Sequence, residues 1–300
     1  RWRHHERPGH DKLHRLGRGA TVRTVRLNQT AHHLGPIPRS PAPVPGRLPR
    51  VPIRVCVAGV TGWTGSAVAA AVEAADDLVL VAGVSRSDPN SFSTVAEALD
   101  HADVDVLVDY THAGVVRENV HAALDRGVAV VVGSSGLSAT EYQDIDRRAR
   151  EQGVGVVAAG NFSLAAALLL RFATEAAQRL GSWEIIDYAS HGKPDAPSGT
   201  ARELAERLES IGSPTVAVPV AETLGAPEAR GATVGTTQVH SLRLPSFSVS
   251  TEIVLAGTDE RLSIRHDAGS TAAPYVAGTL TAIREVGRRV GLIRGLDRLL

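Results

Sequence analysis

From residue 53 onward, short apolar runs alternate with longer amphipathic stretches. The runs are rich in Val and most end near a glycine, as buried parallel strands do. They cover residues 53–60, 78–84, 104–110, 128–134 and 154–160. Stretches of helical composition lie between them at 66–75, 115–124 and 139–152. Strands and helices that alternate in this way predict a parallel sheet with right-handed crossovers.

After residue 160 the pattern changes. A long apolar helix is expected over 164–180, then a strand over 183–189 and a second helix over 201–210. Residues 239–257 and 260–269 alternate with period two, which favours antiparallel strands, and 274–290 form an amphipathic final helix. We therefore expect an α/β protein, with a Rossmann-like parallel-sheet domain followed by an α+β domain that contains a mixed or antiparallel sheet.

The first fifty residues differ from the rest in charge and composition. They hold eleven basic and two acidic residues, seven of the sixteen prolines and no sustained apolar periodicity. Such a segment buries too little surface to offset its ordering entropy. We expect residues 1–51 to be a disordered extension. A basic arm for nucleic acid and an Arg-rich transit peptide stay open as alternatives. The absence of methionine, even at position 1, suggests a fragment or a misplaced start.

Composition excludes several classes of protein. The hydrophobic share is 43% and the aromatic share 4%, so the core must consist of Ala, Val and Leu. A single cysteine, Cys56, allows no internal disulfide and no cysteine-based zinc cluster. That is compatible with a reducing cytoplasm. No apolar run reaches the roughly 18–20 residues that span a bilayer. We expect a cytoplasmic protein with a small-molecule substrate and without metal, membrane or nucleic-acid partner.

Gly59, Gly62 and Gly65 form a GxxGxxG motif between the first strand and the first helix. In a dinucleotide-binding fold these glycines allow a tight turn, bring the backbone close to the pyrophosphate and let the helix pack on the strand. The helix N-terminus then faces the phosphates with its free amides. The alternative is a glycine-rich turn without a ligand. The strand–turn–helix context favours the dinucleotide.

The residues about twenty positions further on indicate which dinucleotide is bound. Ser85 and Arg86 stand where an acidic residue would bind the ribose hydroxyls of NAD. A hydroxyl and a guanidinium suit a 2′-phosphate instead, because Arg can pair with it in a forked geometry. NADPH is therefore favoured, with NADH possible. Alternatively, Arg86 is a solvated loop charge.

The segment 190–200, SHGKPDAPSGT, opens the helix over 201–210. Backbone amides of Ser198, Gly199 and Thr200, together with the Lys193 ammonium, would form a carboxylate site. From the residues alone, an N-capped helix after a loop explains the segment equally well. His112 after the third strand, and His240 and Arg243 on a later strand, are weaker candidates.

Residues 53–300 resemble the bacterial dihydrodipicolinate reductase family, also called 4-hydroxy-tetrahydrodipicolinate reductase. The resemblance depends on GVTGWTG (59–65), DYTH (109–112), GSSG (133–136), GNFS (160–163), KPDAPSGTA (193–201), EARG (228–231) and IRHD (264–267). It implies a dinucleotide-binding domain over 52–160 and a substrate-binding and oligomerisation domain over 161–268. The C-terminal segment 269–300 would return to the first domain, and the assembly would be a homotetramer.

The resemblance also implies roles for individual residues. Lys193 matches the family's proton donor, and Ser190, Ser198, Gly199 and Thr200 match substrate-binding positions. The positions that match the cofactor site are Gly59, Gly62, Trp63, Thr64 and Gly65 at the pyrophosphate, Gly133, Ser134 and Ser135 beside the nicotinamide, and Asn161, Phe162 and Ser163 at the hinge.

One departure from the family pattern concerns the acid–base chemistry. Two consecutive histidines normally precede the lysine motif, and Ala189 and Ser190 occupy those positions here. Neither side chain titrates near neutral pH. The resemblance implies NAD(P)H-dependent reduction of 4-hydroxy-tetrahydrodipicolinate in lysine and diaminopimelate biosynthesis. The alternatives are a paralogous NADPH-dependent reductase of another cyclic imine or keto acid, and a non-catalytic dinucleotide sensor.

Overall fold

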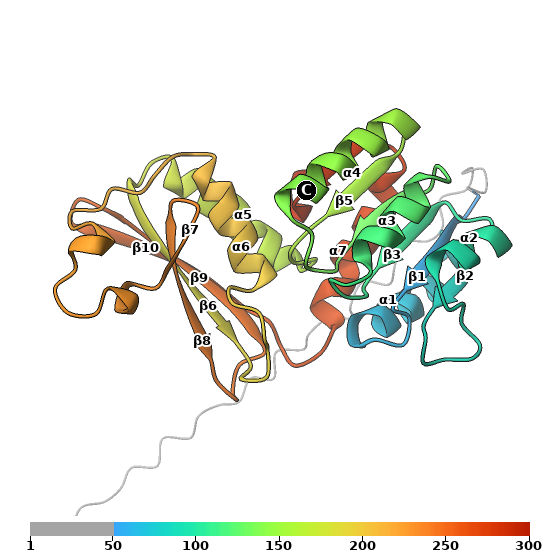
Figure 1. Cartoon of the computed structure of the whole chain (residues 1–300), viewed down its shortest axis with the longest axis horizontal. Coiled ribbons are helices and arrows are strands. Elements are labelled where there is room, and N and C mark those ends of the chain that lie inside the picture. The colour runs from blue at the N-terminus through green and yellow to red at the C-terminus, as the bar shows by residue number, and fades with distance from the viewer. Residues whose placement is uncertain (1–50) are drawn as a thin grey trace, which may run out of the picture. The chain divides into compact units, whose positions relative to one another are not determined.

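The computed structural model describes residues 51–300, so the predictions for the basic N-terminal segment lie outside it apart from residue 51. Six parallel strands form the first sheet, in the order β11-β5-β4-β3-β1-β2. Strands β5, β3, β1 and β2 of this sheet are labelled in Figure 1. The strands are β1 (Ile53–Ala58), β2 (Leu78–Val84), β3 (Val106–Asp109), β4 (Ala129–Val132), β5 (Gly155–Ala158) and β11 (Gly291–Arg294). The predicted Rossmann-like parallel sheet is confirmed. Strand β11 was not predicted.

Helices cover both faces of this sheet, because its strands are apolar on both sides. Helices α2 (Val95–His101), α3 (Val116–Leu124) and α4 (Ala139–Gln152) pack against one face. Helices α1 (Trp63–Glu73) and α7 (Ala273–Val286) pack against the other. All residues of β3, β4 and β5 are buried. Each fully buried Val contributes on the order of 1.5–3 kcal/mol, so many small side chains replace the large aromatic residues that the chain lacks.

The second sheet has five strands in the order β10-β9-β6-β8-β7. They are β6 (Ser182–Ala189), β7 (Ala232–Val234), β8 (Thr237–Arg243), β9 (Val249–Gly257) and β10 (Glu260–Asp267). Strands β6 and β8 run parallel and the other pairs are antiparallel, so the predicted mixed sheet is confirmed.

Burial along β6 alternates, with Trp183, Ile185, Asp187 and Ala189 inside. Helices α5 (Leu164–Ala177) and α6 (Gly199–Glu209) cover this inner face. The opposite face bears Ile186 and Tyr188, and no helix of residues 51–300 covers it (Figure 1). Short 3-10 turns lie at Val220–Glu222, Pro227–Arg230 and Leu296–Leu299. Among the described residues, no helix has both the length and the apolar character needed to cross a bilayer.

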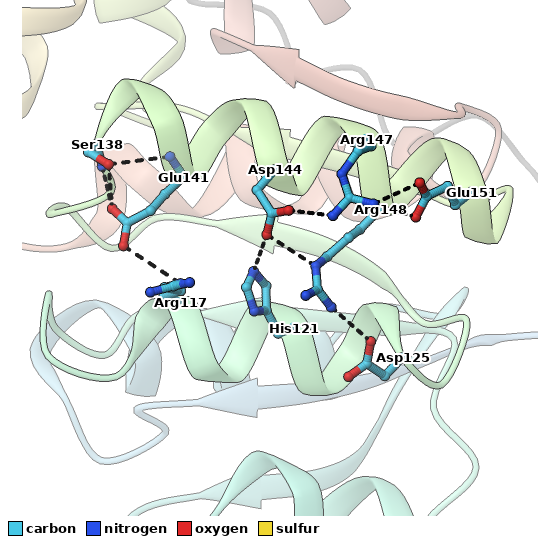
Figure 2. A network of polar contacts seen from close by, with 9 residues as sticks. All are labelled: Arg117, His121, Asp125, Ser138, Glu141, Asp144, Arg147, Arg148 and Glu151. Carbon is cyan, nitrogen blue, oxygen red and sulfur yellow. Dashed lines mark hydrogen bonds and ion pairs between the residues drawn. The ribbon is translucent and has the colours of Figure 1, made fainter.

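Charged side chains join α3 to α4 on the outside of the first sheet (Figure 2). Arg148 Nε lies 3.1 Å from the Asp144 carboxylate on its own helix, and its Nη1 lies 3.3 Å from Asp125 at the end of α3. His121 of α3 lies 3.3 Å from Asp144 without the geometry of a hydrogen bond. Exposed pairs of this kind contribute only about 0–1 kcal/mol each. They align two helices that the apolar core already holds.

Candidate active site

The glycine loop after β1 forms an open helix N-terminus. Gly59 has φ +81°, and its amide donates to the Val84 carbonyl at 2.9 Å. A side chain at buried Gly65 would overlap the Gly59 carbonyl, so α1 can approach β1 only with glycine there. Gly62 caps α1 without a side-chain hydrogen bond, and the first turn of α1 has no acidic residue. This cradle fits a pyrophosphate group.

A cavity of about 510 Å³ extends from this loop between β2, α2 and α3. Ser85, Arg86 and His112 line it, and Arg86 Nη2 lies 3.4 Å from His112 Nε2. The hydroxyl of Ser85 lies 2.7 Å from that of Thr61 and 3.0 Å from that of Ser87. Three hydroxyls and one guanidinium therefore gather where the sequence predicts the ribose phosphate. Thr61 and Ser87 were not predicted, although Thr61 lies within the GxxGxxG motif.

A second cavity, of about 160 Å³, brings the predicted cofactor residues and the predicted substrate turn together. It contains Lys193, the only ammonium side chain of residues 51–300. The first domain contributes Trp63, Thr64, Tyr110, Gly133, Ala159, Gly160, Asn161, Phe162 and, from α7, Tyr275; the turn before α6 and the second sheet contribute Ser198, Gly199, Thr200 and Val249.

Apart from Gly62 and Gly65 of the glycine loop and Ser163, which caps α5, three predicted site residues line neither cavity. Ser134 is buried, and its hydroxyl donates to the Asp109 carboxylate. Ser135 is exposed, and Ser190 is half-buried beside the turn. Sequence reasoning missed Asp109, which also accepts from the Thr111 hydroxyl at 2.8 Å and from Asn119 at 2.7 Å. This carboxylate fixes the loops after β3 and β4 where they pass the two cavities.

The substrate turn is held by a buried carboxylate below it. Asp187 is fully buried, and its Oδ2 accepts from the Ser198 amide at 2.9 Å and from Arg243 Nη2 at 2.8 Å. The same Nη2 donates to the Asp195 carbonyl at 2.7 Å. The Ser198 amide is therefore already used, and the Ser198 hydroxyl caps α6. Only the Gly199 and Thr200 amides of the predicted anion site are available.

Lys193 Nζ lies 2.8 Å from Asp195 Oδ1, and its side chain is 30% exposed. Ala189 is fully buried, and His191 is exposed and outside the cavity. His240 pairs with Glu184 at 2.7 Å on the other face of the second sheet. No imidazole from the described residues lines the cavity that contains Lys193.

Two tyrosines complete the wall of this cavity. The Tyr110 hydroxyl lies 2.6 Å from the Thr279 hydroxyl, and burial raises the pKa of Tyr110 far above its ordinary value. Tyr275 of α7 meets Trp63 edge to face, with ring centroids 5.8 Å apart, and burial raises its pKa too. Both phenols therefore stay neutral at physiological pH and act as walls and hydrogen-bonding groups.

Comparison with known proteins matches both parts of the chain. Residues 53–162 match the family model described as dihydrodipicolinate reductase, N-terminus, and 165–300 match the model for its C-terminus. The chain belongs to the dihydrodipicolinate reductase family. A 4-hydroxy-tetrahydrodipicolinate reductase of Beutenbergia cavernae is 40% identical, with 83% of this chain and 98% of that protein covered. One from Mycobacterium sp. (strain KMS) is 36% identical, covering 83% and 99%.

Comparison with solved structures agrees with this family assignment. The dipicolinate-bound dihydrodipicolinate reductase of Paenisporosarcina sp. TG-14 matches with a TM-score of 0.70 and 26% identity, over 83% of this chain and 100% of that one. GenD2 from gentamicin A biosynthesis, in complex with NAD, shares the fold at 17% identity, with a TM-score of 0.59 over 88% and 93%. As a dihydrodipicolinate reductase family member, the chain is an NAD(P)H-dependent oxidoreductase, and its open α1 N-terminus fits that cofactor.

Proposed function

We propose that the chain reduces 4-hydroxy-tetrahydrodipicolinate to tetrahydrodipicolinate with NADPH, a step of lysine and diaminopimelate biosynthesis. One observation carries the proposal. A single cavity is lined by Trp63 and Thr64 at the start of α1, by the turn at Ser198–Thr200 and by Lys193. A dinucleotide held by the loop and a dicarboxylate held by the turn would meet there.

The chain's own residues would bind and orient the reactants. The free amides at the start of α1 would hold the pyrophosphate, and Asn161 and Phe162 would lie beside the nicotinamide. The bound cofactor supplies the hydride. On the substrate side, the Gly199 and Thr200 amides hold one carboxylate at the N-terminus of α6.

Lys193 has two roles in this proposal. Its ammonium attracts the dicarboxylate, and it holds the proton that assists loss of water and protonation of the product. Asp195 holds the ammonium at 2.8 Å before substrate arrives. Since no imidazole lines the cavity within residues 51–300, Lys193 is the group that we assign to proton transfer.

The preference for NADPH over NADH is proposed from the larger cavity. Arg86 carries a positive charge that can pair with a 2′-phosphate, and the hydroxyls of Thr61, Ser85 and Ser87 lie beside it. Among the residues that line this cavity, the loop after β2 supplies no acidic side chain. The larger cavity does include Glu118 of α3, so the preference depends on the charge that Arg86 supplies.

Steady-state reduction of the dihydrodipicolinate synthase product, measured with NADPH and with NADH, tests the function. We expect Lys193→Ala to lower turnover by about 10²-fold or more, because a positioned proton donor contributes about 10²–10⁴-fold. His191→Ala is the matched control, since that side chain is exposed on the same turn. Unchanged turnover in Lys193→Ala would remove the role given to the lysine.

A paralogous reductase of another cyclic imine is the second candidate. It is favoured by one observation, the buried Ala189 where the family pattern has histidine. Turnover of another cyclic imine, without turnover of the dihydrodipicolinate precursor, would support it. Tight binding of pyridine-2,6-dicarboxylate with NADPH but no turnover of either would instead indicate a sensor.

We also propose that the protein is a homotetramer in the cytoplasm. The face of the second sheet with Ile186 and Tyr188 carries no helix from the described residues, and an exposed apolar surface is a common site of contact between protein chains. The single buried cysteine suits a reducing compartment. Light scattering of the purified protein measures the mass of the assembly. A monomer at micromolar concentration would exclude the tetramer.

A further inference from the structure

Glu203 is a buried carboxylic acid that the proposed chemistry does not use. It lies on α6, close after the turn that we assign to substrate, and it is 7% exposed. It lines neither cavity described above. Buried acids are rare unless something compensates for their lost hydration. The contacts of Glu203 should therefore show what compensates for its lost hydration.

The carboxylate makes one short hydrogen bond, and it is to the backbone. Glu203 Oε2 accepts from the Gly160 amide at 2.6 Å, while Oε1 has no hydrogen-bond partner. Burial raises the pKa of Glu203, and the Gly160 amide and Arg207 oppose that rise. Arg207 lies 3.6 Å from Oε1, but its own hydrogen bonds go to the Asp297 carboxylate and the Arg294 carbonyl. The charge of Arg207 alone does not make this arrangement stable, because the desolvation free energy of a buried ion pair often exceeds the attraction between its charges.

The hydrogen bond fixes the backbone at the point where the first sheet meets the substrate turn. Gly160 follows β5 and packs directly on the first residue of α6, because a Cβ on Gly160 would lie 2.6 Å from the Gly199 carbonyl oxygen. Next along the chain, the Asn161 amide side chain donates to the Thr200 hydroxyl at 3.2 Å. Gly160, Asn161, Gly199 and Thr200 all line the small cavity.

We infer that Glu203 is a positioning residue, which sets the distance between the Gly160–Asn161 segment and the Gly199–Thr200 turn. The inference rests on the proposed function, in which the segment flanks the nicotinamide and the turn holds a carboxylate. Glu203 touches neither reactant. It acts through the Gly160 amide, and hydride transfer requires the reacting atoms to approach within about 3–3.5 Å.

Substitutions at position 203 test this role. Glu203→Gln keeps an oxygen acceptor for the Gly160 amide, Glu203→Ala removes it, and Glu203→Asp keeps the charge on a side chain that is one methylene shorter. Glu209→Gln is the matched control, since Glu209 is exposed at the end of the same helix. The measurements are kcat, KM for the dicarboxylate, the dissociation constant of NADPH, thermal unfolding, and the kinetic isotope effect with NADPH deuterated at the transferred position.

We expect kcat of Glu203→Ala and Glu203→Asp to fall by about 10–100-fold. The NADPH dissociation constant should change less than about threefold, and the isotope effect should rise because hydride transfer becomes more rate-limiting. Glu203→Gln should stay within about threefold of wild type. If Glu203→Ala does not fold, Glu203→Asp carries the same comparison.

Two results would overturn the inference. One is a folded Glu203→Ala or Glu203→Asp variant with wild-type kcat and isotope effect. The other is a loss in Glu203→Gln as large as that in Glu203→Ala, which would point to the charge and not to the hydrogen bond. An inactive wild-type enzyme would instead contradict the proposed function, so the two failures can be told apart.

Discussion

The ammonium of Lys193 and the carboxylate of Asp195 form an ion pair at 2.8 Å on the rim of the cavity where we place the reaction. The two residues are separated only by Pro194, and the Asp195 carbonyl is held by Arg243. The lysine thus begins from a defined position. A dicarboxylate that enters the cavity must share the ammonium with Asp195 or take it over.

Asp195→Asn tests the first part of this relationship. The amide keeps an oxygen near Lys193 but loses the charge that orients the ammonium. We expect kcat/KM for the dicarboxylate to fall by about 3–10-fold, because a partly exposed ion pair contributes only about 0.2–1 kcal/mol and its geometry adds some orientation. Steady-state kinetics at saturating NADPH measures the change. A loss as large as that of Lys193→Ala would mean that Asp195 itself takes part in the chemistry.

Arg86→Ala tests the cofactor preference. A guanidinium hydrogen bond to a charged group contributes about 1.5–3 kcal/mol. The variant should therefore bind NADPH about 10–100-fold more weakly and leave the affinity for NADH within a few-fold. Fluorescence titration of both reduced cofactors gives the ratio. Arg117→Ala, which removes an exposed arginine from nearby α3, is the control for net charge. Equal losses for NADPH and NADH would contradict the assignment of the 2′-phosphate to Arg86.

His121 between α3 and α4 gives the protein an acid-sensitive contact (Figure 2). Burial and the neighbouring Arg148 lower its pKa below the ordinary value, although Asp144 and Asp125 oppose them. The folded protein therefore favours the neutral imidazole, and the unfolded chain binds the proton more readily. The free energy of unfolding should fall as the pH drops through about 6.5, the ordinary pKa of histidine, until His121 is protonated in both states.

Urea unfolding of wild type and His121→Gln between pH 8 and pH 5 measures that contribution. The variant should show a shallower pH dependence, because its side chain does not titrate. Buried His266, whose pKa is also lowered by burial, should account for part of the remaining slope. Identical slopes for the two proteins would show that His121 does not discriminate between the folded and unfolded states.

Much of the fold could be predicted from local sequence patterns, and the elements that were not predicted lack such a pattern. The runs that contain β1 to β5 could be recognised because most of their residues are apolar, as strands buried on both faces require. Strand β11 is as short as β3, β4 and β5, but its sequence GLIR ends in a charged residue and is only partly buried after Gly291, so it lacks the apolar pattern of those strands. Its existence depends on pairing with β5, a contact that links Gly291 to Gly155 across the sequence. Helix α2, with seven residues, is too short to show helical periodicity.

The site residues that lie in continuous sequence motifs could be predicted. Lys193 and the Gly199–Thr200 turn were recognised from one continuous segment, and both line the cavity. Sequence alone could not show which of Ser134 and Ser135 would be buried, because Asp109 on another strand determines that choice. Asp187 and Glu203 were missed for the same reason, and Arg243 was named only as a weaker candidate. Their importance comes from partners far away in the sequence, and no local pattern records such contacts.

The place of β11 also constrains how the chain can acquire its structure during synthesis. The first sheet begins at Ile53, yet its edge beside β5 is supplied by Gly291–Arg294, which follows the whole second sheet and α7 in the chain. A ribosome must therefore synthesise those elements before that edge can close. Until then, β5 exposes unpaired backbone groups to other nascent chains, and a polypeptide that stops before Gly291 would aggregate more readily than one that includes β11.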